Sequence, residues 1–79
     1  MSNRTIYDSL FTSIFELSSE VLDSNLVYQS VALWDSVGHM QLVSALEDAF
    51  DIMLDTDDII DFSSYEIGLD ILKKYDVEI

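Results

Sequence analysis

The chain has 79 residues, 49% of them hydrophobic, and 16 acidic against 3 basic residues give it a net charge of −13 at pH 7. This hydrophobic fraction predicts a folded core, and the length suits a single domain over residues 1–79. A surface of one negative sign repels phosphate backbones and anionic lipid, so we expect neither nucleic acid nor membrane surfaces as partners.

Several kinds of residue and segment that the sequence lacks narrow the range of possible functions. The sequence has no cysteine, which excludes disulfides, thiolate metal sites and a thiol nucleophile of its own. It shows no basic segment followed by an apolar one at its start and no apolar run near the ~18 residues of a membrane span, so we expect a cytoplasmic protein. One histidine, and a serine with no recognisable base partner, form no catalytic set, so we do not expect an enzyme.

The first predicted element is an amphipathic helix over residues 5–17, ended by Ser18 and Ser19. Its apolar residues share one face: Ile6, Leu10, Phe11, Ile14, Phe15 and Leu17. Residues 19–34 show no sustained period and contain a polar cluster at residues 23–25, so we expect a long loop. Four apolar side chains of this loop are expected to pack on the core: Leu26, Val31, Leu33 and Trp34.

A second amphipathic helix is predicted over residues 36–50, where apolar residues recur every three or four positions. They are Val37, Met40, Val43, Leu46 and Phe50, with Leu42, Ala45 and Ala49 widening the stripe. Asp35 can cap the free backbone N–H groups ahead of Ser36. The peptide dipoles make this end partly positive, which favours an anion such as a phosphate ester on Ser36. The alternative is that both residues are only caps.

The segment after this helix is expected to hold a loop and a short helix. Residues 51–55 alternate apolar and acidic side chains, but so few apolar positions without a partner strand indicate an extended loop. Thr56 is expected to cap a helix over residues 57–61. Three residues of this segment are expected to point toward the core: Ile59, Ile60 and Phe62.

The last predicted helix covers residues 65–75, after a capping box formed by Ser63 and Glu66. Lys73 and Lys74 lie at its negative end, which is favourable. Gly68 in its interior costs about 1 kcal/mol relative to alanine, which makes this helix the least secure. Together the elements predict an all-α four-helix bundle with a long loop between helices 1 and 2 and a short helix 3.

With these elements in place, the chain resembles the acyl carrier protein family over nearly its whole length, most densely over residues 33–62. The run Trp34-Asp35-Ser36-Val37-Gly38-His39-Met40 is similar to the family's attachment motif, an Asp-Ser-Leu-type turn. Residues 42–50 resemble the rest of the family's second helix, and the Phe50-x-Ile52 continuation also fits. The resemblance implies a bundle of acyl-carrier type.

The resemblance also implies a site. Ser36 would carry 4'-phosphopantetheine, transferred from coenzyme A with Mg²⁺ by a phosphopantetheinyl transferase, with Asp35 and Val37 in the attachment turn. The terminal thiol would hold acyl or aminoacyl groups as thioesters. Met40, Glu47 and Asp48 would lie on the partner-binding face of the second helix, which in the family docks basic patches on acyl-loading ligases and synthase enzymes. We expect a monomer.

The sequence departs from the fatty-acid synthesis members at Gly38 and Gln41, where those proteins usually carry acids, with His39 between them. We therefore expect a specialised carrier, dedicated to a secondary metabolite, a surface glycan or an aminoacyl product. His39 is expected to be an ordinary exposed polar residue. Six residues could line a cargo groove of the family's kind or simply pack in the core: Val43, Leu46, Ile59, Phe62, Leu69 and Ile71.

Two alternatives stay open. The first is an acidic helical adaptor with an unmodified Ser36. The second is a calcium sensor, since five residues match positions 1, 3, 7, 9 and 12 of an EF-hand frame: Asp55, Asp57, Asp61, Ser63 and Glu66. That frame requires glycine at position 6 and has Ile60 there. We expect no resident metal, and at most weak divalent binding to the acidic residues of 55–61.

Overall fold

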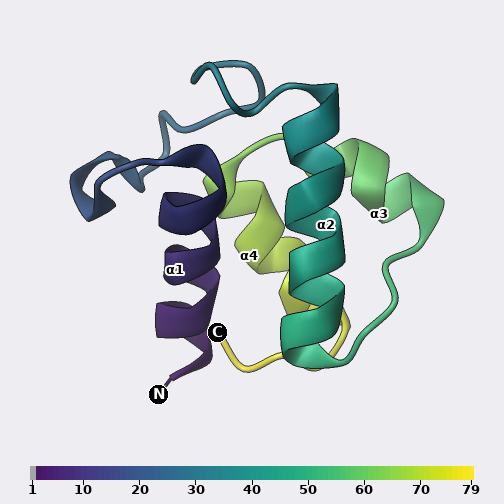
Figure 1. Cartoon of the computed structure of the whole chain (residues 1–79). Helices are drawn as coiled ribbons and strands as arrows, with labels where there is room; N and C mark the ends of the chain where they lie inside the picture. Colours follow the sequence, from purple (N-terminus) through teal and green to yellow (C-terminus); the bar gives the residue numbers. More distant parts are fainter. Residues whose placement is uncertain (1) are drawn as a thin grey trace.

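The computed structural model describes residues 2–79, which form an all-helical fold without a strand. Its helices are α1 (Asn3–Phe15), α2 (Ser36–Phe50), α3 (Thr56–Asp61) and α4 (Tyr65–Lys74), and the first loop contains a turn of 3-10 helix, η1 (Ser19–Val21). α1 and α2 stand side by side, α4 crosses behind them, and α3 lies on the outer side of α2 (Figure 1). The predicted all-α class and order of elements are confirmed. No helix within residues 2–79 is long and apolar enough to cross a membrane.

α1 begins and ends two residues earlier than predicted. The hydroxyl of Ser2 accepts the N–H of Thr5 at 3.1 Å, so Ser2 caps the helix. At the other end Glu16 takes a left-handed conformation, with φ 54°, and its N–H bonds to the carbonyl of Thr12. A left-handed residue of this kind turns the chain out of the helix and satisfies a free carbonyl, which explains the early end.

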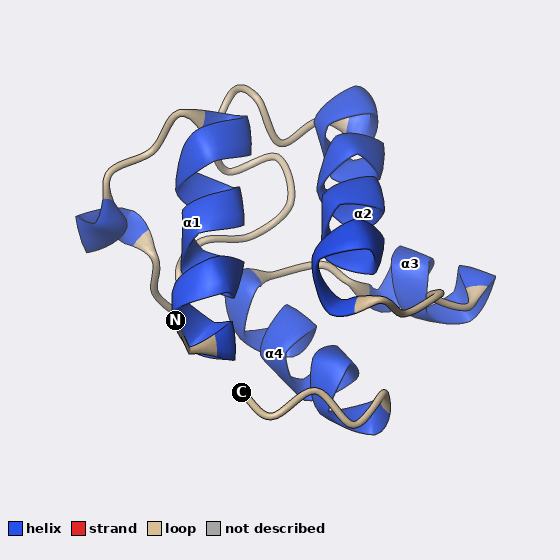
Figure 2. Cartoon of the chain, turned by 60° about the horizontal axis from the view of Figure 1, so that its bottom comes forward, coloured by secondary structure: helices blue, strands red, loops and turns tan. Residues whose placement is uncertain are grey.

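The long loop between α1 and α2, drawn in tan in Figure 2, is anchored by two buried residues. Leu26 and Trp34 are buried as predicted, and Val31 packs partly buried against the core. The prediction for Leu33 is wrong, because its side chain is 42% exposed. The backbone of Leu33 lies against α2 at Gly38, which leaves its side chain directed toward solvent.

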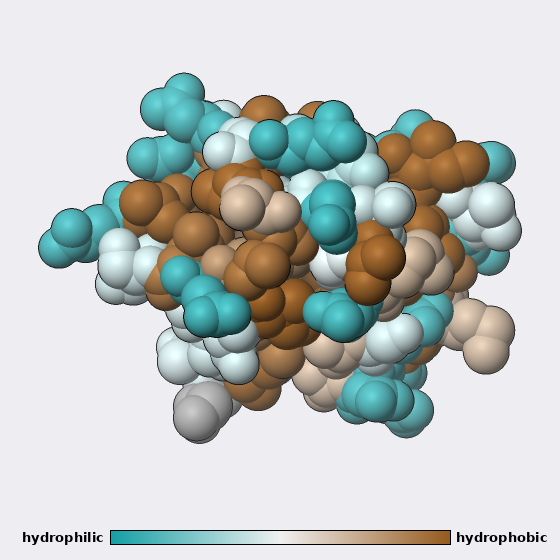
Figure 3. Space-filling view, turned by 45° about the horizontal axis from the view of Figure 1, so that its top comes forward, coloured by the Kyte–Doolittle hydropathy of each residue, from teal (hydrophilic) through white to brown (hydrophobic). Residues whose placement is uncertain are grey.

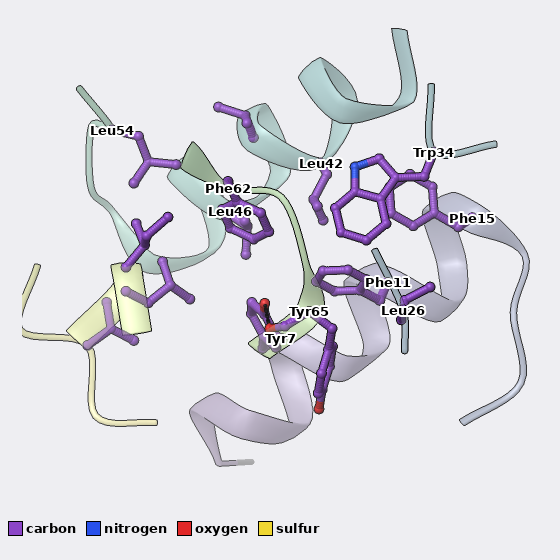
Figure 4. Packing of buried hydrophobic residues seen from close by; sticks show 14 residues of the cluster. Tyr7, Phe11, Phe15, Leu26, Trp34, Leu42, Leu46, Leu54, Phe62 and Tyr65 are labelled. Carbon is purple, nitrogen blue, oxygen red and sulfur yellow. Dashed lines mark hydrogen bonds between the residues drawn. The ribbon is translucent and has the colours of Figure 1, made fainter. Parts of the chain in front are cut away.

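Aromatic rings fill the centre of the core (Figure 4). The ring of Phe11 lies 4.9 Å from Tyr7, 5.4 Å from Trp34 and 5.3 Å from Tyr65, measured between centroids. Trp34 also stacks on Phe15 at 5.2 Å with an interplanar angle of 18°. Buried aromatic side chains remove the largest apolar areas from water, so this cluster ties the end of the first loop firmly to α1.

α3 differs from its prediction in two ways. Thr56 is the first residue of the helix, and Asp55 precedes it without a capping bond from its side chain, so the predicted Thr56 cap is wrong. Ile59 and Phe62 pack on the core as predicted, whereas Ile60 is 72% exposed. Residues three or four apart share a helix face, so a face that turns Asp58 and Phe62 inward turns Ile60 outward.

α4 begins at Tyr65 as predicted and ends one residue early, but its cap is one residue later than expected. The hydroxyl of Ser64 accepts the N–H of Ile67 at 3.0 Å, so Ser64 and not Ser63 is the cap. An isolated antiparallel bridge between Val27 and Ser64 places this residue at the start of the helix. Lys73 and Lys74 occupy the last turn as predicted.

Gly68 lies where α4 passes α1. The residue is buried, and a β-carbon there would overlap the ring of Phe62 and the hydroxyl of Tyr7. Glycine lowers the helix propensity at this position, but it allows α4 to approach Tyr7 and Phe62 more closely than any larger residue would.

Candidate functional site

Ser36 is the first residue of α2 and is exposed. The carboxylate of Asp35 accepts the N–H of Gly38 at 2.8 Å, which confirms Asp35 as the cap of this helix. Within residues 2–79, the N–H groups of Ser36 and Val37 donate to no protein acceptor, and the Ser36 hydroxyl forms no hydrogen bond. An exposed hydroxyl, two N–H groups that have no acceptor within residues 2–79 and the positive end of a helix dipole therefore meet at one point.

The turn that presents Ser36 is held by close packing at Gly38. A β-carbon on Gly38 would overlap the carbonyl oxygen of Leu33 and lie 3.2 Å from the ring of Phe15. Only glycine allows the end of the loop to approach the helix this closely. Gly38 thus fixes the path of residues 33–35 just before the serine, and an acidic side chain cannot occupy this position without displacing the loop.

His39 corrects a prediction, since it is not an ordinary exposed residue. Its ring is half-buried and uses both nitrogens. Nδ1 accepts the indole N–H of Trp34 at 3.0 Å, and Nε2 lies 2.8 Å from the carbonyl oxygen of Ile59. The sequence held one signal of this role, a tryptophan five residues before the histidine, but Ile59 could be found only from the fold.

Exposed side chains continue from Ser36 along one face of α2. Val37 is 66% exposed and Met40 50% exposed. A shallow hollow on this face is lined by Ser36, Val37, Met40, Gln41 and Ser44. Met40, Ser44 and Asp48 follow one another at four-residue spacing, which places them in one row on the helix surface. The structure therefore brings Ser36, Val37 and Met40 together, with exposed Asp48 farther along the same row.

Glu47 does not share this arrangement. Its side chain is partly buried, and a carboxylate oxygen accepts the N–H of Leu54 at 2.9 Å. This bond holds the extended loop after α2 against the helix. Glu47 is thus engaged in the fold itself, unlike the exposed Asp48 next to it.

A pocket of about 240 Å³ lies between α3 and the N-terminal half of α2. Six residues line it: Tyr28, His39, Ile59, Ile60, Phe62 and Ser63. Ile59 and Phe62 were among the six candidate groove residues. The others belong to the core, where Val43, Leu46 and Ile71 are buried and Leu69 packs partly buried. Figure 3 shows that hydrophobic side chains interrupt the hydrophilic surface on the face obtained by turning the top of Figure 1 forward.

α3 is also fixed on its other side. The carboxylate of Asp58 pairs with the ammonium of Lys74 and accepts the hydroxyl of Tyr75. The bonds from Lys74 and Tyr75 hold the pKa of Asp58 below its ordinary value. Asp58 is therefore a charged anchor between α3 and α4.

The EF-hand frame is contradicted by this arrangement. An EF-hand needs a loop where residues Thr56–Asp61 form α3. Within the described residues, no three His, Cys, Asp or Glu side chains are grouped to hold a metal ion.

Comparisons of the chain with models of known protein families, with curated proteins and with solved structures found no match.

Proposed function

We propose that this protein is an acyl carrier protein whose Ser36 bears 4'-phosphopantetheine. The observation that carries the proposal is the exposed Ser36 hydroxyl at the first position of α2, beside a capping Asp35 and without a hydrogen bond to any residue of 2–79. A transferase needs free access to a serine oxygen, and this one is accessible. The arm would carry acyl or aminoacyl groups as thioesters, which supplies the thiol that the cysteine-free chain lacks.

The surroundings of Ser36 suit a phosphodiester. Its negative charge would lie at the end of a 15-residue helix, next to two N–H groups that have no acceptor among the residues that the structure describes. Helix N-termini stabilise anions through these donors and through the dipole. Asp35 supports the same geometry by closing the first turn through Gly38, so that the product would be held at a rigid point.

The exposed face of α2 supports docking of partner enzymes. Val37 and Met40 offer apolar contacts close to the serine, and Asp48 offers a charge farther along the helix. The net charge of −13 would steer basic surfaces toward the protein and oppose association between two copies. We propose a monomer that binds a phosphopantetheinyl transferase and acyl-loading ligases or synthase enzymes with basic patches.

Position 38 supports a specialised carrier. The acid that fatty-acid synthesis members usually carry there cannot be accommodated beside the Leu33 carbonyl, so this chain presents a different docking surface. Glu47, engaged with Leu54, is less available to partners than Asp48.

Intact mass spectrometry tests the proposal after incubation with coenzyme A, Mg²⁺ and a broad-specificity phosphopantetheinyl transferase. Ser44→Ala is a matched control, because Ser44 is an exposed serine that lines the same hollow as Ser36. We expect one phosphopantetheine on the wild type and on Ser44→Ala, and none on Ser36→Ala. If Ser36→Ala still gained a phosphopantetheine, the attachment site would be a residue other than Ser36. No modification, while a known carrier is modified in the same mixture, would favour the adaptor.

A further inference from the structure

The ring of His39 connects two parts of the chain that are far apart in sequence. An indole N–H can only donate, so Nδ1 of His39 accepts from Trp34 and carries no hydrogen. In the neutral ring the hydrogen is then on Nε2, which donates to the carbonyl oxygen of Ile59 at 2.8 Å. Trp34 is fully buried and stacked on Phe15, so the residue that donates to His39 is held firmly in the core.

The acceptor at Ile59 belongs to a helix that needs outside support. α3 has only six residues, and isolated helices of that length are not stable in water. The carbonyl groups in its last turn have no partner within the helix, and His39 satisfies that of Ile59. The bonds of Asp58 to Lys74 and Tyr75 hold α3 toward α4, whereas the bond of His39 holds it toward α2.

The same imidazole is a wall of the pocket. It makes edge-to-face contacts with Tyr28 at 5.5 Å and with Phe62 at 6.0 Å, and Ile59 and Ile60 of α3 also line the pocket. A movement of α3 away from α2 would therefore carry two lining residues away from His39 and widen the pocket.

We infer that His39 is a positioning residue that holds α3 against the N-terminal half of α2 and thereby keeps the apolar pocket narrow. Four residues carry the inference in a continuous path, from Phe15 through Trp34 and His39 to Ile59. The inference goes beyond the proposed function, since it concerns the unmodified protein and holds whether or not Ser36 carries a prosthetic group.

The test compares amide hydrogen exchange, helix by helix, in the unmodified wild type, His39→Phe and His39→Gln. Phenylalanine retains a ring and loses both bonds, whereas a glutamine amide can accept at one atom and donate at the other. One net hydrogen bond is worth about 1 kcal/mol, so we expect exchange in residues 56–63 to be roughly fivefold faster in His39→Phe. Exchange in α1 should change little, and His39→Gln should remain close to the wild type.

Unchanged exchange of α3 in His39→Phe overturns the inference. Equal acceleration in all helices also overturns it, because His39 would then be a general core residue. Equal acceleration of α3 in both variants overturns the role of the hydrogen bonds. Binding of N-phenyl-1-naphthylamine, an uncharged apolar dye, provides a second readout. We expect the dye to bind His39→Phe several-fold more tightly than the wild type. Unchanged binding would count against the idea that His39 keeps the pocket narrow.

A measurement on the wild type keeps the inference testable if a variant does not fold. The chain has a single histidine and a single tryptophan, so ring ¹⁵N resonances and the indole N–H need no assignment among alternatives. We expect a protonated Nε2, an unprotonated Nδ1 and an indole N–H slow to exchange. A protonated Nδ1 in the neutral ring overturns the arrangement. None of these measurements depends on modification of Ser36, so their outcome is separate from that of the mass experiment.

Discussion

The carbonyl oxygen of Leu33 lies so close to the α-carbon of Gly38 that a β-carbon on this glycine would overlap it. The contact presses the end of the first loop against the first turn of α2, next to Ser36. It turns the side chain of Leu33 outward and leaves no room for an acid at position 38. One close approach between two backbones thus shapes both the turn that presents Ser36 and the surface around it.

Replacing Gly38 by alanine is expected to destabilise the protein in spite of the higher helix propensity of alanine. The methyl group must displace the backbone of Leu33, and overpacking of this kind costs about 1–3 kcal/mol or more. Urea unfolding followed by circular dichroism measures the loss. Ser44→Ala, at an exposed position of the same helix, should stay within about 0.5 kcal/mol of the wild type. A Gly38→Ala variant as stable as this control would contradict the packing argument.

Gly68→Ala should also lower the free energy of unfolding, by up to about 2 kcal/mol, because steric overlap outweighs a propensity gain of about 1 kcal/mol. The obstacles are side chains here, Phe62 and Tyr7, so the effect should be relieved by trimming one of them. We expect Gly68→Ala with Phe62→Leu to be less destabilised than the sum of the single variants. Simple additivity in the unfolding experiments would show that the two positions do not compete for space.

Asp35→Ala removes the cap of α2 and should cost about 0.5–2 kcal/mol of stability. Asp35→Ser should recover most of this loss, since a serine hydroxyl can accept the same N–H of Gly38. Chemical denaturation of the three proteins measures the effect. Equal destabilisation by alanine and serine would mean that the charge, and not the capping bond, is what matters.

The anchor between α3 and α4 predicts a dependence on pH. Because Lys74 and Tyr75 hold the pKa of Asp58 below its ordinary value of 3.8, its contribution to stability is full above that pH and is lost as pH falls through the lower folded value. Asp58→Asn should therefore be less stable than the wild type at neutral pH. The gap in the free energy of unfolding should narrow as the pH falls below 3.8 and close once the pH passes the lower pKa of folded Asp58. The neighbouring Asp57→Asn, at an exposed position, should show no such gap. A gap that is the same at all pH values would contradict the role of the Asp58 charge.

Added salt should raise the melting temperature at neutral pH. With 16 acidic and 3 basic residues, repulsion between like charges opposes the folded state, and ions screen it. Scans at low and high NaCl, repeated with Mg²⁺, measure the shift, which should shrink near pH 4 as carboxylates become protonated. A melting temperature insensitive to both salts would show that the charges are already balanced locally.

The sequence by itself determined the helices, because helix formation depends on residues three or four apart. The bounds of α2, Ser36–Phe50, agree with the prediction, since an apolar stripe and the Asp35 cap are both local signals. The exposed serine in the first turn follows from the same signals. Burial of Leu26 and Trp34 was also predictable, because a small domain must use its large apolar side chains.

Only the tertiary structure decided how polar and backbone groups are paired across the bundle. Ser64 replaces Ser63 as a cap because the loop near Val27 meets it, and His39 is drawn inward because Ile59, twenty residues later, presents a free carbonyl. Asp58 is buried for the same kind of reason, with Lys74 and Tyr75 opposite it. Periodicity along a chain reports which face of a helix is apolar, whereas the partner of a hydrogen bond between distant segments exists only once the fold has brought them together.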